Sequence, residues 1–162
     1  MLAEGDRFTV TPTFHVFQMY LPHSGAQAVR AEFTAPSISN PLANAPIPAG
    51  GNSYRGSLDA SKTLAGLSGS ASVSAGNSKQ ITLTVVNPHL DQPLTTEVVV
   101  HGASIASATG TVLNEADVHT HNDFDHPNAV HPRPATIGQP TAGRLLLTFP
   151  VASVTALNIT LA

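Results

Sequence analysis

The stretch "ITLTVVN" (residues 81–87) decides the fold. Its apolar residues Ile81, Leu83 and Val85 alternate with the hydroxyl residues Thr82 and Thr84. Side chains on a β-strand point to opposite faces in turn, so this pattern gives one apolar face and one polar face. Such a half-buried strand is typical of an antiparallel sheet that covers a core on one side only.

Six more stretches carry strand signals, and nothing between them indicates a helix. They lie at 28–35, 66–75, 96–102, 106–114, 144–150 and 153–162. Turn-forming residues separate most of these runs, with Gly, Asn, Asp and Pro gathered at the breaks. Successive short strands without intervening helices predict an all-β domain built as an antiparallel β-sandwich.

One convincing helix signal precedes the strands, in "TPTFHVFQMYLPHSGA" (11–26). Thr11 followed by Pro12 suits the N-cap and first helical positions, because a proline lacks the N–H that would have no partner there. Pro22 and Gly25 favour an end to the helix. We therefore predict one short N-terminal helix before the sandwich, and we predict a surface loop over the proline-rich segment 36–56.

Composition limits what the chain can bind. The 162 residues suit one domain, and the formal charge of −3 without a Lys/Arg cluster argues against nucleic acid or an anionic membrane as partners. Without cysteine the chain has neither disulfides nor thiolate metal sites. No apolar run approaches the roughly 18–20 residues of a membrane span. The N-terminal "MLAEGDRFTV" does not resemble a signal peptide, so we expect a cytoplasmic protein.

The histidine-rich stretch "HTHNDFDHPNAVHPRP" (119–134) raises the question of a metal site. It nearly matches the H-x-H-x-D-H pattern of zinc hydrolases, but Phe124 stands where the last histidine belongs. A jelly-roll H-x-H site would use Asp125 near the position of its acid, and a third histidine is missing. His119 and His121 share one side of an extended segment and stay weak metal candidates. We favour a proline-stiffened loop with solvated histidines, and we expect no cofactor.

The residues also lack a complete active site. The chain has no G-x-S-x-G or S-x-x-K motif. Glycoside hydrolysis requires two carboxylates about 5–10 Å apart across a cleft. The pairs Glu115/Asp117 and Asp123/Asp125 are close in sequence, but they fall in loops where carboxylates are ordinarily solvated.

Four ordered motifs resemble a known family. They are "TPTFHVFQMY" (11–20), Val86–Asn87, "HNDFDHPNAV" (121–130) and Pro150–Ser153. Together they are similar to the C-terminal part of family 51 glycoside hydrolases, the α-L-arabinofuranosidases. Phe14 replaces the tyrosine that is usual there, and Asp123 replaces the usual threonine.

The resemblance implies a retaining enzyme whose (β/α)8 barrel carries two catalytic glutamates, followed by a C-terminal jelly-roll sandwich. Residues 1–26 would be the remnant of the last barrel helix, and 27–162 the sandwich. The four glutamates of this chain do not fall in a matching catalytic motif; they are Glu4, Glu32, Glu97 and Glu115. We therefore assign no catalytic residue and expect the chain alone to be inactive.

The resemblance also implies structural roles in the loop. We expect His121 to belong to a fixed loop core in which Asn122 bonds backbone in a turn, Phe124 fills the core and Pro127 stiffens the exit.

On the helix, Phe14, Phe17 and Leu21 form one apolar face that would contact barrel neighbours. Without the barrel, helix 11–26 is expected either to fold back on the sandwich or to mediate a homo-oligomer.

Two other functions remain open at this point. A free carbohydrate-binding module for arabinose-containing polysaccharide would fit a sandwich, although the chain has no Trp, two Tyr and six Phe. A metal-dependent jelly-roll enzyme would use His119 and His121. The accessory domain of an α-L-arabinofuranosidase, with the catalytic barrel as partner, is the interpretation that we favour.

Overall fold

The computed structural model describes residues 1–39 and 63–162. Its helical elements are α1 (Pro12–Tyr20) and the single 3-10 turn η1 (Leu21–His23). The strands of the first half are β1 (Leu2–Glu4), β2 (Arg7–Thr9), β3 (Gln27–Val29), β4 (Ile38–Ser39), β5 (Thr63–Leu64) and β6 (Ser68–Ser74). Those of the second half are β7 (Asn77–Asn87), β8 (Leu94–Val98), β9 (Ile105–Leu113), β10 (Arg133–Pro134), β11 (Leu145–Phe149) and β12 (Ser153–Leu161).

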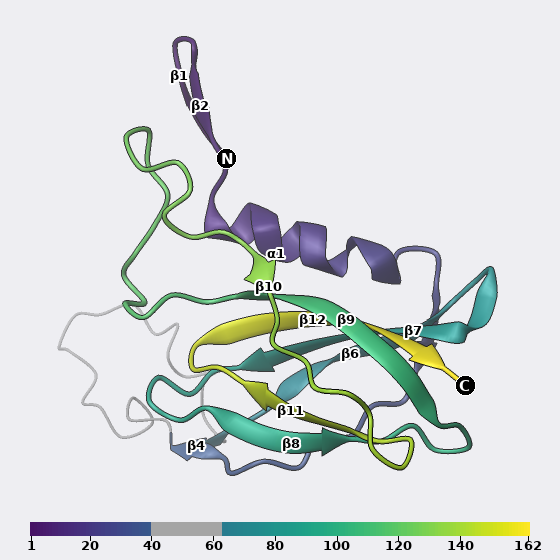
Figure 1. Ribbon diagram of the computed structural model, residues 1–162. Helices are drawn as coiled ribbons and strands as arrows, with labels where there is room; N and C mark the ends of the chain where they lie inside the picture. The colour runs from purple at the N-terminus through teal and green to yellow at the C-terminus, as the bar shows by residue number, and fades with distance from the viewer. Residues whose placement is uncertain (40–62) are drawn as a thin grey trace, which may run out of the picture.

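These strands form two facing layers, with α1 lying across the outer face of the larger one (Figure 1). The larger sheet has six antiparallel strands in the order β10-β9-β12-β7-β6-β3. The second layer pairs β8 with β11 in antiparallel register. The predicted antiparallel β-sandwich with one short N-terminal helix is confirmed.

The core lies between the two layers, as the alternation in β7 predicts. Ile81, Leu83 and Val85 are buried there, and β12 places Leu157 directly opposite Leu83. From the second layer, β11 contributes three alternate residues, Leu145, Leu147 and Phe149. Fully burying a side chain of this size contributes about 1.5–3 kcal/mol, so this apolar contact is what holds the layers together.

The helix is shorter than predicted and packs through a different face. Thr11 is the N-cap and Pro12 the first helical residue, as expected, but the α-helix ends at Tyr20 and gives way to η1 around Pro22. Met19 is buried against Leu113 and Val130, with Val16 beside it. The predicted face is turned outward, with Phe17 72% and Leu21 65% exposed, while Phe14 is half-buried. The helix does fold back on the sandwich, which is one of the two expected outcomes, but it packs through Met19 and Val16 and not through the predicted face.

Some strands differ from the sequence-based expectation. The strand predicted at 28–35 stops at Val29, and residues 30–37 continue outside any strand. The loop predicted at 36–56 lies mostly outside the described residues, and within them Ile38–Ser39 pairs with β5. The hairpin β1–β2 was not predicted. In the described ranges, no helix is long and apolar enough to cross a membrane.

Candidate functional site

Two segments far apart in sequence project together from one end of the sandwich, beside the start of α1. They are the N-terminal residues 1–11, which include the hairpin β1–β2, and the loop 114–132 (Figure 1). We call these two segments the arm. Most of the candidate site residues from the sequence lie in the arm.

Asn122 joins the two segments of the arm. Its side chain is 1% exposed, and its Nδ2 donates to the carbonyl oxygens of Val10 and Val130, each at 2.9 Å. Its Oδ1 accepts the backbone N–H of Val130 at 2.7 Å. The prediction that Asn122 bonds backbone is confirmed, but the bonds cross the loop and reach the N-terminal segment instead of closing a local turn.

The hairpin packs on the loop through a second set of contacts. Arg7 Nη2 donates to Asp125 Oδ1 at 2.6 Å, and its guanidinium lies 4.9 Å from the centre of the Phe124 ring. Thr9 Oγ1 donates to the carbonyl oxygen of Pro127 at 3.3 Å. Phe124 is half-buried and belongs to neither core cluster, so its predicted core role is wrong. Phe124 instead contacts Arg7 of the hairpin β1–β2, which was not predicted from the sequence.

The carboxylates of the loop bond to its own backbone. Asp123 Oδ1 accepts the backbone N–H groups of Asp125 at 2.8 Å and His126 at 2.5 Å. The bond from the His126 backbone is the main reason that the pKa of Asp123 is lowered. Asp117 Oδ1 accepts the N–H of His119 at 2.9 Å. These acids shape turns, as Asx side chains often do.

Glu115 and Asp125, the other members of the two acidic pairs, face arginines. Glu115 Oε2 lies 3.8 Å from Arg133 Nη2, and Asp125 pairs with Arg7. The two carboxylates of Glu115/Asp117, and likewise those of Asp123/Asp125, therefore do not face each other across a cleft as glycoside hydrolysis requires.

The histidines of the loop are exposed, and those with a partner contact nearby backbone or, for His126, the Asp123 carboxylate at 3.2 Å. His119 and His121 are both exposed, and His121 Nδ1 lies 3.0 Å from the carbonyl oxygen of His119. His131 Nδ1 is similarly 2.8 Å from the carbonyl oxygen of Asn128. In residues 1–39 and 63–162, no three His, Asp or Glu side chains are grouped to hold a metal ion.

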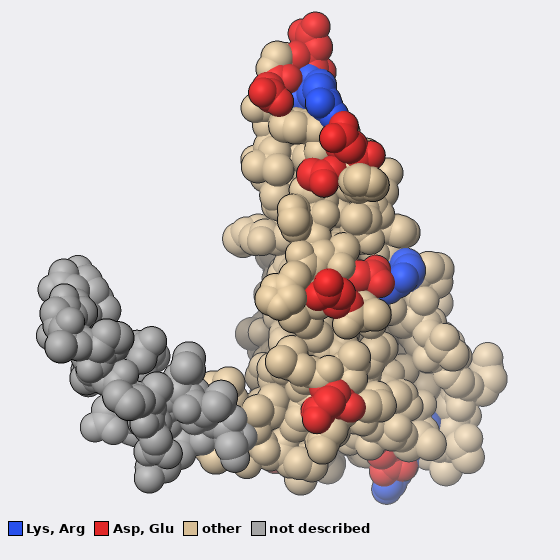
Figure 2. All heavy atoms as spheres, turned by 90° about the vertical axis from the view of Figure 1, so that its left-hand side faces the viewer, with Lys and Arg blue, Asp and Glu red and all other residues tan. Residues whose placement is uncertain are grey.

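The surface of the arm is both acidic and apolar. Six of the ten acidic residues of the chain fall within it, with Arg7 as its one Lys or Arg residue. Figure 2 shows acidic side chains gathered at this projecting end. Between them Leu2, Phe8 and Val118 are exposed. A surface of this mixed kind suits contact with another protein surface better than catalysis.

A second buried asparagine, Asn87, connects strands at one end of the sandwich. From the sequence it was recognised only as part of a motif. Asn87 is fully buried, and its Nδ2 lies 2.9–3.1 Å from the carbonyl oxygens of Gln92, Phe149 and Pro150. Its Oδ1 accepts the N–H of His89 at 3.1 Å. The motifs Val86–Asn87 and Pro150–Ser153, ordered but separate in sequence, thus meet in space.

His23 connects the helical segment to the large sheet and was not singled out from the sequence. Its Nδ1 lies 2.7 Å from Ser72 Oγ on β6, and its Nε2 lies 2.9 Å from Thr84 Oγ1 on β7. Burial lowers the pKa of His23. No spacing or motif around His23 indicates these partners, because they come from strands far along the chain.

Comparison with known proteins agrees with this architecture. Residues 1–153 match the family described as the alpha-L-arabinofuranosidase C-terminal domain. The GH51 arabinofuranosidase from Xanthomonas axonopodis pv. citri is 21% identical with a TM-score of 0.80, over 98% of this chain and 28% of that one. A family 51 alpha-L-arabinofuranosidase from Bifidobacterium longum is 19% identical with a TM-score of 0.71, over 93% and 26%.

The chain therefore spans between a quarter and a third of the length of these two relatives. An alpha-L-arabinofuranosidase from Thermotoga maritima is 26% identical with a TM-score of 0.52, over 59% of this chain and 19% of that one. No curated protein matches the sequence. The family match covers nearly the whole chain and agrees with the four ordered motifs, so the chain belongs to the alpha-L-arabinofuranosidase C-terminal domain family.

Proposed function

We propose that this chain is the accessory β-sandwich of an α-L-arabinofuranosidase, and that the arm and the outer face of α1 dock on the catalytic (β/α)8 barrel. The family match over residues 1–153 is the observation that carries the proposal. In this arrangement residues 1–26 continue from the barrel and residues 27–162 form the accessory sandwich.

The distribution of exposed apolar side chains supports this docking surface. Phe8 in the arm is 61% exposed, and Phe17 and Leu21 on the outer face of α1 are exposed as well. Large apolar side chains left exposed on a domain of this kind commonly mark a surface that another protein covers. The bonds of Asn122 hold the arm in one shape before docking, which lowers the entropy lost on association.

The chain by itself should not hydrolyse arabinofuranosides. A retaining mechanism needs a nucleophile and a proton donor about 5–5.5 Å apart on either side of the glycosidic bond. The acids of the arm are exposed or half-buried, and the four in its loop bond to backbone or face an arginine. Substrate hydrolysis, with arabinan or other hemicellulose as the source, would be the task of the barrel.

The test is to produce a family 51 barrel without its C-terminal domain and to add this chain to it. We expect the chain to raise the Tm of the barrel and to increase its turnover of a chromogenic α-L-arabinofuranoside. The chain alone should give no turnover above buffer, with or without a chelator. Turnover by the chain alone, or a barrel indifferent to its addition, would contradict the proposal.

A carbohydrate-binding module would behave differently in affinity electrophoresis. The exposed aromatic side chains among the described residues are Phe8 on the hairpin and Phe17 on the helix, which do not form a platform on one sheet face. We therefore expect unretarded migration on arabinan and arabinoxylan, whereas retardation on either would favour the module.

A further inference from the structure

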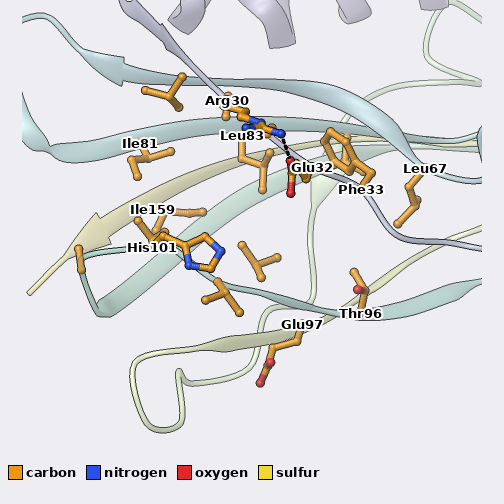
Figure 3. A pocket seen from close by; sticks show the side chains of 18 of the residues that line it. Arg30, Glu32, Phe33, Leu67, Ile81, Leu83, Thr96, Glu97, His101 and Ile159 are labelled. Carbon is orange, nitrogen blue, oxygen red and sulfur yellow. Dashed lines mark ion pairs between the residues drawn. The ribbon is translucent and has the colours of Figure 1, made fainter.

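Two hollows in the surface of the sandwich differ in character. The larger, of about 740 Å³, lies between the two layers, and its floor consists of aliphatic core residues such as Ile81 and Leu83 (Figure 3). The smaller, of about 250 Å³, lies on the outer face of the large sheet, beside the helical segment that crosses it (Figure 1). We call the smaller one the helix–sheet pocket. It is lined by Gln18, Met19, Pro22, Thr82, Gly110, Thr111, Pro132, Ala156 and Asn158.

The floor of the helix–sheet pocket is polar because it belongs to the outer face of the sheet. The alternation that buries the apolar residues of β7 in the core sends Thr82 to this outer face. Asn158 on β12 lies directly opposite Thr82, and Ala156 lies opposite Thr111 on β9. The three central strands thus place two hydroxyl groups and one amide beside each other.

Thr82 is the most enclosed polar residue of this floor. It is 9% exposed, and its hydroxyl makes no hydrogen bond with the residues that the structure describes. Buried polar groups in native proteins nearly always have a partner from the protein, from water or from a ligand. The neighbouring Asn158 is exposed, and its amide can both donate and accept. The floor therefore offers a hydroxyl and an amide to a molecule in the pocket.

The walls of the pocket are apolar and uncharged. Met19 and Pro22 come from the helical segment, and Pro132 stands before β10. The described residues that line the pocket include no Asp, Glu, Lys, Arg or His. A charged ligand would lose its hydration here without gaining a counter-charge, and a wholly apolar ligand would leave Thr82 without a partner. A sugar ring is uncharged and carries hydroxyl groups beside C–H groups, so it suits both the floor and the walls.

The volume of the pocket suits one ring. A volume of about 250 Å³ corresponds to about eight water molecules at about 30 Å³ each. A pentose has about ten non-hydrogen atoms, and covalent bonds hold them closer together than separate waters, so one ring fits. Two linked rings exceed this volume.

We propose that the helix–sheet pocket binds one neutral sugar ring of pentose size, and that its ligand is L-arabinose. Thr82 and Asn158 bond the hydroxyl groups of the ring, and Met19, Pro22 and Pro132 contact its C–H groups. The choice of L-arabinose among pentoses rests on the proposed function, because an α-L-arabinofuranosidase releases this sugar.

Such a pocket does not make the chain a carbohydrate-binding module. No aromatic side chain lines it, and a ligand of about ten non-hydrogen atoms at ordinary ligand efficiency binds with a Kd on the order of 1–10 mM. One site of this strength is too weak to anchor the chain on a polysaccharide. Unretarded migration on arabinan and arabinoxylan is therefore still expected.

The test titrates the full chain, labelled with nitrogen-15, with L-arabinose up to about 50 mM, several times the expected Kd. Amide chemical shifts are followed by NMR. We expect saturable shifts at residues 82, 110–111 and 156–158, with the amides of the arm unchanged. Glycerol at the same concentration has hydroxyl groups but no ring, and it should not give saturable shifts.

Thr82→Val and Thr160→Val form the variant pair. Thr82 lines the pocket, whereas Thr160 is exposed on the same face of β12 as Asn158 but outside the pocket. Losing one hydrogen bond should raise the Kd about fivefold in Thr82→Val alone. Asn158→Ala, with Asn77→Ala as its control, provides a second comparison at exposed positions and decides if Thr82→Val does not fold.

The proposal is overturned if the pocket amides show no saturable shift, if glycerol shifts them to the same extent, or if Thr160→Val weakens binding as much as Thr82→Val. Tighter binding of D-xylose than of L-arabinose would overturn the assignment of the ligand. None of these titrations involves a barrel, so failure of the proposed function is seen separately, in the docking assay.

Discussion

The two buried asparagines use the same chemistry in different surroundings. Asn87 bonds the backbone at the end of the sandwich, and Asn122 bonds the backbone of the arm. The neighbours of Asn87 in the core, such as Val85 and Phe149, are fully buried. The arm around Asn122 instead carries exposed apolar side chains, of which Phe8 is one.

The bonds of Asn87 stabilise the domain, whereas those of Asn122 fix the shape of a surface that a partner can bind. The amide of Asn87 satisfies the carbonyl of the core residue Phe149 and joins the ends of β7 and β11, so its bonds belong to the stability of the whole fold. The amide of Asn122 keeps two surface segments in a fixed relation. A rigid arm with an uncovered apolar surface is what a docking element requires.

The largest expected effect is that of Asn87→Ala. It leaves the backbone carbonyls of Gln92, Phe149 and Pro150 and the His89 N–H without their amide partner, and we expect the free energy of unfolding to fall by about 3–5 kcal/mol. Urea denaturation measures the loss. Asn77→Ala is the matched control, because Asn77 is exposed and accepts one bond, from the Lys79 N–H; it should cost less than about 0.5 kcal/mol. Equal losses in the two variants would show that the bonds of Asn87 contribute no more to stability than the one bond of the exposed Asn77.

Asn122→Ala should have a smaller global effect and a local signature. We expect the free energy of unfolding to fall by about 1–3 kcal/mol, because three backbone groups lose their partner instead of four and the arm can open without the core. Hydrogen exchange should rise in residues 1–11 and 114–132 while β7 and β12 stay protected. An increase spread evenly over the sandwich would show that the arm is not a separate unit.

Removing the Arg7–Asp125 pair should change stability little. Both side chains are largely exposed, at 52% and 80%, and exposed pairs typically contribute about 0–1 kcal/mol. The contact of Arg7 with the Phe124 ring adds a similar small amount. A double-mutant cycle with Arg7→Gln and Asp125→Asn measures the coupling. A coupling above about 2 kcal/mol would mean that the arm is held by charge and not by Asn122.

The smallest effect concerns pH and His23. Burial lowers the pKa of His23 in the folded chain below its ordinary value of 6.5. The unfolded chain then binds the proton first as pH falls, so this contribution to stability is present above pH 6.5 and is lost as pH falls through the folded pKa. His23→Gln should flatten the decline of stability below this pH. The same change at the exposed His101 is the control, and an identical flattening there would contradict the assignment.

Sequence patterns predicted the sandwich well because period-two alternation reports directly which face of a strand is buried. The alternation in β7 placed Ile81, Leu83 and Val85 on the buried face, and all three lie in the core. The helix was less well predicted, since Phe17 and Met19 are both apolar, and helical periodicity alone does not say which of the two faces the sheet. The hairpin β1–β2 has three residues in each strand, too few for a reliable pattern.

Site prediction succeeded where chemistry is local and failed where it depends on distant partners. The amide of Asn122 was expected to bond backbone because asparagine in loops commonly does so. The position of Phe124 depends on Arg7, and the role of His23 on Ser72 and Thr84, all remote in sequence. Neither contact could be predicted before the topology was known.

The most direct measurement of the central claim is the Kd of this chain for a family 51 barrel that lacks its C-terminal domain, using a pair of variants. Phe8→Asp and Leu146→Asp each place a charge on an exposed strand residue, at 61% and 66% exposure, in the arm and on β11 respectively. If the arm docks on the barrel, Phe8→Asp raises the Kd at least about tenfold, and Leu146→Asp leaves it unchanged. Equal affinities for the two variants, or loss of binding only with Leu146→Asp, would contradict the account.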